Sequence, residues 1–400
     1  MSRQLTSGVL GRKKGKLIPW YTDDEIFSFI AEGYLPVSNR NDLNALGSQT
    51  AVPRTWAIGS KFQVDDREGG PGNYIMINDI DLSDDNWSSI VNWGGILDGG
   101  GHIVKNMYIN KPTSIREGLF SNSTDVFTIK NLALLNAYVN SRDKSAIIVG
   151  GPSDSNTIEN CIVQGIINVT TSVGEQGGII GLNASDTSNI SNVISSVMNI
   201  NTAGGQSLGG IVGRNTGTQN VLNSYVLGHY YTSYTGTRIS AVIGRDGNTV
   251  TNVYRDSDIV NYVRGGVPKT TNELITGEPS VDIFTEWDAN VWQFETGKYP
   301  ILKPFGELAI NRPAPVNVQL SETGGDVTIT WDEPVLKPVG YHIYRMINNG
   351  IPAKIASVGD LIYIDESLAS NSYEYYVTAE YNINNRISET SNSTVKSITL

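Results

Sequence analysis

The stretch GGIVGRNTGTQNVLNSYV, residues 209–226, is nearly repeated as GGIIGLNASDTSNISNV at residues 177–193. Both copies begin with paired glycines, continue through Ile and Val, and end in β-forming residues around an Asn. Self-similarity at a fixed period is typical of solenoids, propellers and repeat arrays. The spacing of this pattern along the chain therefore decides the fold.

Two independent markers keep one period. The central glycines of the apolar stretches follow one another at steps of 31, 32 and 31 residues, and Ser121 stands 29 residues before the first of them. These glycines are Gly150, Gly181, Gly213 and Gly244. The second marker is an Asn in a β-forming context, found at Asn106, Asn131, Asn160, Asn192, Asn223 and Asn252. A shared period in both markers indicates a true repeat.

Each unit of about 30 residues holds about three short β runs, such as GGIVG, NVLNSYVLG and HYYTSYT, separated by turn residues. Three strands closed by three turns make one coil of a β-helix, and stacked coils pair their strands at a spacing of ~4.8 Å. A propeller blade usually needs four strands and ~40 residues. The repeat therefore predicts an all-β solenoid.

The repeated residues have a physical reason. We expect the glycines to permit a positive φ at a corner where a side chain would clash, and the Ile and Val residues to pack inside the coil. Asn tolerates the left-handed conformation, and stacked Asn amides can hydrogen-bond along the axis. These residues are thus predicted to be a folding device and not a catalytic signature.

The segments GLFSN, GGIIGLN, GGIVGRN and AVIGRD resemble the GLUG repeats of bacterial and phage surface proteins. The flanks PVSNRNDLNAL and FTEWDANVWQFETGKYPIL are similar to the usual entry and exit of such a domain, so the resemblance covers residues 36–305. It implies an adhesive or structural protein without a shared active site.

Both ends of the solenoid are predicted to carry short helices that cover open strand edges. SNRNDLNALG indicates a helix that begins at Ser38 or Asn39 and stops at Gly47. TTNELITG pairs Thr270 with Glu273 as a capping box. Trp287 and Trp292 follow the second helix, and we expect them to help cover the edge there.

Residues 306–315 form a Pro-marked linker, and residues 316–400 contain seven β runs. Their spacing suggests a sandwich, and the segment resembles a fibronectin type III domain. The resemblance implies that Trp331 is the core Trp and that Tyr373, in LASNSYEYYVTA, is the corner tyrosine. Such a domain serves as a spacer or as a module that binds protein or glycan.

Residues 1–35 are interpreted as a basic and aromatic attachment arm. Its candidate contact residues are Arg12, Lys13, Lys14, Trp20 and Tyr21. The segment TDDEIFSFIAEG carries Thr22 and Glu25 as a capping box and Gly33 as a stop. The predicted helix either packs on the first coil or inserts into a partner.

Composition excludes several function classes. The net charge of −11 over 400 residues argues against nucleic acid as a partner. The single cysteine, Cys161, allows no internal disulfide and is expected to be a buried, inert thiol. No segment is apolar for long enough to insert into a membrane, and the basic N-terminus lacks the apolar run of a secretory signal. We therefore expect synthesis in a cytoplasm without export by that route.

The carboxylates of the chain raise the alternative hypothesis of an enzyme. The best carboxylate candidates lie in the entry segment, where Asp98 stands near His102, and they are Asp79, Asp81, Asp84, Asp85 and Asp98. Turns and caps explain them better than a hydrolase pair does. Inside the repeats the acidic residues are sparse and none recurs on a neighbouring coil. No catalytic residue, metal or cofactor is therefore expected.

The tyrosines of HYYTSYT, residues 229–235, are expected to stack on sugars, line the core or form a subunit contact.

The sequence as a whole predicts an all-β protein: a solenoid of ~30-residue repeats with short capping helices, then a fibronectin type III sandwich. The predicted function is that of a non-enzymatic structural virion protein of a bacteriophage, in the tail fibre, tail or baseplate. The arm would bind other virion proteins, and host-surface glycan or protein is a further partner. A polysaccharide-depolymerising tailspike, a capsid-decorating head fibre and a bacterial cell-surface adhesin are the alternatives, and the oligomeric state stays open.

Overall fold

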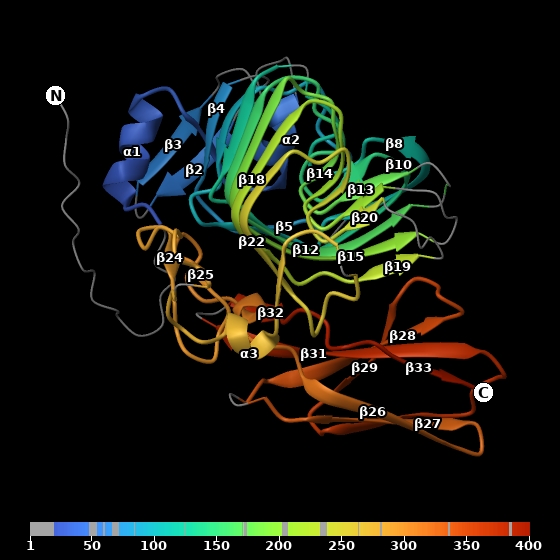
Figure 1. Ribbon diagram of the computed structural model, residues 1–400. Coiled ribbons are helices and arrows are strands. Elements are labelled where there is room, and N and C mark those ends of the chain that lie inside the picture. The colour runs from blue at the N-terminus through green and yellow to red at the C-terminus, as the bar shows by residue number, and fades with distance from the viewer. Residues whose placement is uncertain are drawn as a thin grey trace.

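The structure is a computed structural model. It describes residues 20–47, 54–58, 61–65, 72–83, 85–123, 125–169, 171, 174–201, 207–232, 238–262, 264–280, 282–334, 337–383 and 386–400. The predicted fold class is confirmed. A β-solenoid of about five turns is followed by a β-sandwich that lies along its side (Figure 1).

The main sheet of the solenoid is parallel, and each strand pairs with the strands one coil before and after it. Its path runs through β1 (Leu35–Val37), β4 (Gly72–Met76), β6 (Gly95–Asp98), β9 (Phe127–Lys130), β12 (Asn156–Val169), β15 (Thr187–Asn201), β18 (Thr218–Val226), β22 (Thr249–Asp256) and β23 (Val267–Lys269). Joined to it are β5 (Ile80–Asp81), β7 (Ile103–Lys105), β8 (Tyr108–Ile115), β10 (Ala133–Asp143) and β19 (Tyr230–Thr232). The register steps by one repeat, since Phe127 pairs with Asn156 and Asn156 with Ser188.

Two short parallel sheets close the coils. One contains β11 (Ser145–Ala146), β13 (Glu175–Gly177), β16 (Ser207–Gly209) and β20 (Ile239–Ser240), and the other contains β14 (Ile180–Asn183), β17 (Val212–Asn215) and β21 (Ile243–Arg245). A separate hairpin is formed by β2 (Arg54–Ile58) and β3 (Lys61–Asp65). Ile158, Ile190 and Val221 occupy equivalent positions and are fully buried. The inward packing of Ile and Val is therefore as predicted.

The repeated asparagines bend the long strands. All six adopt a left-handed backbone, with φ between 47° and 61°. The Nδ2 of Asn160 donates to Oδ1 of Asn131 at 3.0 Å, and the Nδ2 of Asn192 donates to Oδ1 of Asn160 at 3.1 Å. Each long strand thus covers two sides of its coil, and the predicted amide ladder runs along the bend.

The ladder does not include every predicted member. Asn106 lies in a second row, where it accepts a hydrogen bond from Nδ2 of Asn136 at 2.7 Å. On the side of the first coil, the ladder continues from Asn131 to Asp98, whose Oδ1 accepts from the Asn131 amide at 3.0 Å. At the other end, the Asn252 amide donates to Glu286. Asn106 was assigned to the wrong row because its spacing of 25 residues from Asn131 is shorter than one repeat.

The repeat glycines are required for a different reason from the expected one. Gly150, Gly181, Gly213 and Gly244 do not adopt a positive φ. A Cβ on Gly213 would lie 2.5 Å from the Gly181 carbonyl oxygen, and one on Gly244 would lie 2.5 Å from the Gly213 carbonyl oxygen. The close approach of the neighbouring coil, and not backbone conformation, therefore excludes a side chain here.

Three short α-helices begin where the sequence indicates. α1 (Asp23–Ala31) and α3 (Thr271–Leu274) both start with the predicted capping boxes. α2 (Arg40–Asn44) is capped by Asn39 and continues into the 3-10 turn η1 (Ala45–Gly47). Buried leucines of α2 and η1 join the solenoid core, so this helix closes the first coil.

The segment after α3 lies along the side of the solenoid, not over its end. It includes β24 (Trp292–Gln293), β25 (Ile301–Leu302) and the 3-10 turn η2 (Ala309–Asn311). Trp287 stacks on Tyr225, with ring centroids 6.3 Å apart, and the Trp292 indole donates to Asn192. Both Trp residues therefore cover an apolar outer face of the long strands, which corrects their expected place at the edge.

The C-terminal residues form a two-sheet antiparallel sandwich. One sheet contains β26 (Val316–Thr323), β27 (Asp326–Asp332) and β30 (Ile362–Asp365), and the other contains β28 (Gly340–Ile347), β29 (Ala353–Val358), β31 (Ser372–Ile383), β32 (Arg386–Glu389) and β33 (Lys396–Thr399). Trp331 is buried between the sheets, and its ring meets Tyr341 edge-on. Tyr373 donates its hydroxyl proton to the Ala369 carbonyl at 2.8 Å, the geometry of a tyrosine corner.

Two substitutions of Asn160 separate the two contributions that it makes to stability, its amide hydrogen bonds and its tolerance of the left-handed backbone. Asn160→Gly removes two amide hydrogen bonds and keeps the left-handed backbone, and we expect it to lower the free energy of unfolding by about 1–2 kcal/mol. Asn160→Ala also places a Cβ in the left-handed region, so it should cost about 1 kcal/mol more. Urea unfolding followed by circular dichroism measures the difference. Equal losses for the two variants would contradict the backbone part of the argument.

Candidate functional site

The entry-segment carboxylate Asp79 is an anchor for the sandwich. Its Oδ1 accepts from Nδ1 of His102 and from Nη2 of Arg386, each at 3.0 Å. Burial acts to raise the pKa of Asp79, but the His102 hydrogen bond and the Arg386 guanidinium outweigh it and lower the pKa to about 2. Asp79 is therefore held ionised in a pair that joins residues 307 positions apart in the chain.

The other candidate acids also serve the structure. Asp81 accepts from the Asn106 amide at 2.8 Å and pairs with Lys105 at 3.0 Å. Asp98 is fully buried and forms the base of the Asn ladder. Asp85 accepts from a neighbouring backbone N–H, and Asp84 lies outside the described residues.

The attachment arm is described only in part. Arg12, Lys13 and Lys14 lie outside the described residues. Trp20 is exposed, but the Tyr21 hydroxyl donates to Oδ2 of Asp98 at 2.8 Å. Helix α1 is thereby fixed to the first coils of its own chain, so Tyr21 is not free for a partner in this conformation.

The HYYTSYT tyrosines that the structure describes are buried. Tyr230 lies in the solenoid core and donates to the Ser240 carbonyl at 2.9 Å. Tyr231 packs between the solenoid and the sandwich, beside Met198 and Tyr376. Neither ring is available to a sugar, and Tyr234 lies outside the described residues. The predicted buried thiol of Cys161 is also found, and burial raises its pKa to about 12.

An extensive interface joins the two domains. Apolar side chains meet there, namely Met198, Ile200, Tyr231, Met346 and Tyr376, with Ile166, Tyr344 and Val395 packed against them. Gln164 donates from Nε2 to the carbonyls of Glu389 and Thr390, at 3.0 and 2.9 Å. Arg386 adds bonds to the carbonyls of Phe305 and Gly101. The sandwich is therefore fixed to the solenoid at several separate points.

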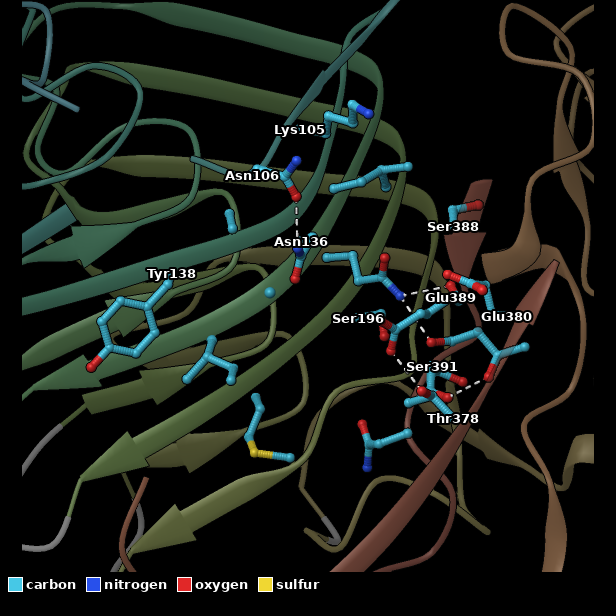
Figure 2. Close-up of a pocket in the computed structure, with 18 of the residues that line it drawn as sticks. Lys105, Asn106, Asn136, Tyr138, Ser196, Thr378, Glu380, Ser388, Glu389 and Ser391 are labelled. Atoms are coloured by element: carbon cyan, nitrogen blue, oxygen red, sulfur yellow. Dashed lines mark hydrogen bonds between the residues drawn. The ribbon is translucent and has the colours of Figure 1, made fainter. Parts of the chain in front are cut away.

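A cleft of about 560 Å³ remains between the domains. Figure 2 shows solenoid residues such as Asn106, Asn136 and Tyr138 on one side and Thr378, Glu380 and Glu389 of the sandwich on the other. The sandwich wall comes from β28, β29, β31, β32 and the segment 390–392. Both domains build this concave site together, and it is the candidate functional site.

The carboxylates of the cleft already have partners. Glu389 accepts from the Thr378 hydroxyl at 2.6 Å and from the Tyr344 hydroxyl at 2.9 Å. Burial and the neighbouring Glu389 charge raise the pKa of Tyr344 well above its usual value. Nε2 of His342 lies 3.4 Å from Glu380. The Asp79 and Glu389 carboxylates of the cleft are thus already engaged by groups of the chain itself.

A pair of carboxyl groups lies elsewhere, on neighbouring coils, where the sequence had predicted none. The backbone N–H of Glu175 donates to Oδ1 of Asp143 at 3.0 Å, and both residues are more than nine-tenths buried. Burial, and then the Asp143 carboxylate, raise the pKa of Glu175 to about 7. Positions 143 and 175 are 32 residues apart, so the repeat length itself was the signal that could have found the pair.

Metal ligation and membrane insertion can both be judged for the part of the chain that the structure describes. No cluster of three or more His, Cys, Asp or Glu side chains there is placed to hold a metal ion. Among the same residues, no helix has the length and apolar character needed to cross a membrane.

Some solved structures are similar to parts of this chain. No protein-family model matches this chain, and no curated protein matches it. A crystal structure of a candidate immunoglobulin A1 protease from Bacteroides ovatus is similar, with 16% identity and a TM-score of 0.43, over 68% of this chain and 93% of that one. A fibronectin type III domain of human collagen XX is similar at 18% identity and a TM-score of 0.19, over 22% of this chain and 91% of that one. Both likenesses concern fold alone.

Glu175 gives the protein a predictable pH dependence. The pKa of the Glu175 carboxyl is 4.5 in the unfolded chain and about 7 in the folded protein. The folded state therefore binds this proton more tightly, and protonation of Glu175 stabilises it. This stabilisation is fully present below pH 4.5 and is lost as the pH rises through 7. We expect Glu175→Gln to raise the free energy of unfolding by about 1 kcal/mol at pH 8, after allowance for screening, and to change it little at pH 4.

Thermal unfolding at the two pH values measures the effect of Glu175→Gln. The exposed Glu278→Gln provides a control in which a carboxylate without this environment is neutralised. A stabilisation by Glu175→Gln that is the same at both pH values would contradict a role for its titration.

Arg386→Ala tests the joint between the domains. The change removes the ion pair with Asp79 and two hydrogen bonds to carbonyls, and we expect it to weaken docking of the sandwich by about 2–3 kcal/mol. Limited proteolysis of the 306–315 linker should become faster, and small-angle scattering should show a larger radius of gyration. Lys337→Ala, which breaks the exposed pair with Glu333, is the matched control and should leave both measurements unchanged.

Proposed function

We propose that this protein is a non-enzymatic structural protein that acts by binding, carried on the tail or fibre of a bacteriophage particle. The observation that carries the proposal is the joint between the domains. The Asp79–Arg386 pair, the Gln164 bonds and the apolar cluster around Met198 hold the sandwich against the solenoid. Because the two domains are fixed relative to each other, each copy of the protein would present the same binding surface.

The roles of the acidic residues support a non-enzymatic function. A hydrolase needs one carboxyl group to give up a proton and another to stay ionised. Asp79 and Asp81 are instead held ionised beside cations and amide donors, with pKa values of about 2. The phage setting is supported by the resemblance of the solenoid to GLUG repeats, which occur in phage and bacterial surface proteins. In that setting the N-terminal arm would contact other virion proteins.

A depolymerising tailspike is the second candidate, and Asp143 with Glu175 is the observation that favours it. Two carboxyl groups lie together there, and the pKa of Glu175 is raised to about 7. A raised pKa suits a general acid. Neither residue lines the interdomain cleft, however, so a substrate in the cleft would not reach them.

Immunoelectron microscopy on purified phage particles tests the proposal, with an antibody raised against residues 316–400. We expect label on the tail or its fibres. Label on the capsid would make the protein a head fibre, and label on cells without any on particles would make it a surface adhesin. A reducing-sugar assay on host polysaccharide separates the tailspike alternative, because activity that Glu175→Gln abolishes would overturn the non-enzymatic function.

A further inference from the structure

We propose that the interdomain cleft binds a neutral oligosaccharide. This inference rests on the proposed function as a binding protein and names the ligand class and the site. It follows from three properties of the lining: balanced and mostly paired charge, an excess of neutral hydrogen-bonding groups, and an aromatic pair at one end.

The charge of the cleft is balanced. Its lining contains three basic residues, Lys105, Lys354 and Arg386, and three acidic residues, Asp79, Glu380 and Glu389. Arg386 is bound to Asp79, and Lys105 pairs with Asp81 just outside the lining. Recognition of a phosphate or carboxylate would need several unpaired cations that converge on one point. The lining does not offer them, so a neutral ligand fits best.

Neutral hydrogen-bonding side chains outnumber the charged ones in the lining, and several of them also bond within the chain, as Thr378 does to Glu389 and Gln164 to the carbonyls of Glu389 and Thr390. The lining hydroxyls are Ser196, Thr378, Ser388, Thr390 and Ser391, and the lining amides are Asn106, Asn136, Gln164 and Asn392. Figure 2 shows Ser196, Thr378 and Ser391 close together at the domain boundary. Groups that both donate and accept match the hydroxyls of a sugar, which also do both.

One of these hydroxyls has no partner within the described chain. Ser391 is 1% exposed, and its Oγ makes no hydrogen bond. A buried polar atom that is left unpaired costs about 1–3 kcal/mol. A ligand hydroxyl that reached Ser391 would remove this cost. The Oγ of Ser391 is thus an unpaired polar atom among the residues that line the cleft.

An aromatic pair extends the site toward solvent. Tyr138 lines the cleft, and its ring stacks on Tyr108, with centroids 5.2 Å apart and planes 14° apart. Tyr108 is 45% exposed. Beside the rings, the amides of Asn140 and Asn110 form a ladder at 2.7 Å. Tyrosine offers an apolar body with a polar tip, which suits the mixed apolar and hydroxyl faces of a pyranose.

The volume of the cleft is consistent with this ligand. About 560 Å³ lies within the range of small-molecule sites, roughly 300–1,000 Å³. A folded protein partner would need a larger and flatter surface. An extended peptide would need an unpaired strand edge in the cleft, but Gln164 already occupies carbonyls at the end of β32.

The test uses the full chain and isothermal titration calorimetry. The probes are short neutral oligosaccharides of hexose and N-acetylhexosamine, matched oligosaccharides that contain uronic acid, and inorganic phosphate. We expect binding of at least one neutral probe, and weaker or no binding of the acidic probes and phosphate. Tighter binding of an acidic probe, or no binding of any neutral probe, would overturn the proposal.

Two variants connect binding to the cleft. Ser391→Ala removes a buried hydroxyl that has no partner to lose, so we expect equal or higher thermal stability and about tenfold weaker binding. Tyr138→Ala should weaken binding by a similar factor. Tyr363→Ala, a half-buried tyrosine in β30 of the other sandwich sheet, is the matched control and should bind normally. Binding that both cleft variants leave intact would place the sugar elsewhere and overturn the assignment.

The outcome is separable from that of the proposed function. A protein that is located on phage tails but binds no neutral probe overturns this inference alone. A protein that binds a neutral probe through the cleft but is absent from particles overturns only the phage setting.

Discussion

The superposition of successive coils is the constraint on which the rest of this structure depends. Parallel hydrogen bonds between neighbouring coils fix their spacing at ~4.8 Å, so each residue lies directly over its equivalent one repeat away. Side chains at a bend must then stack amide on amide, as Asn131, Asn160 and Asn192 do. Where the backbones of neighbouring coils come closest, no side chain fits, and this is why glycine is required at Gly213 and Gly244. The same geometry brings Asp143 against Glu175.

A second consequence concerns the outer face of the long strands. Positions such as Ile162, Ile194 and Tyr225 point away from the coil interior and are still fully buried. A solenoid with an apolar outer face needs a cover. The segment that follows α3 supplies it over one half of the strands, and the sandwich supplies it over the other half, through Ile166 and Met198. The sandwich is therefore part of the solenoid's packing and does not hang from a free linker.

Much of the fold was predictable because its signals are local or periodic. The left-handed asparagines, the capping boxes and the sandwich follow from residue type and spacing. The positions of Trp287 and Trp292 could not be predicted in this way, because the same aromatic residues suit a cover over the side of the solenoid and a cover over its end. The candidate site was not predicted either. Its decisive contacts join Asp79 to Arg386 and Gln164 to Glu389, across 307 and 225 positions, and no local pattern marks them. One signal was readable in retrospect: runs such as CIVQGIINV are apolar at both parities, as in strands buried on two faces.

The place of the cleft follows from how the cover ends. The sandwich meets the outer face over the later coils, where Met198 and Tyr231 give it apolar contacts. Over the earlier coils the outward residues are Asn106, Asn136 and Tyr138, which are polar or amphipathic and need no complete cover. Arg386 nevertheless holds the sandwich across this region by its pair with Asp79. The sandwich is held close to this polar surface without packing on it, and the cleft is the space left between them. The change from apolar to polar residues along one face of the solenoid therefore explains both the docking of the sandwich and the position of the cleft.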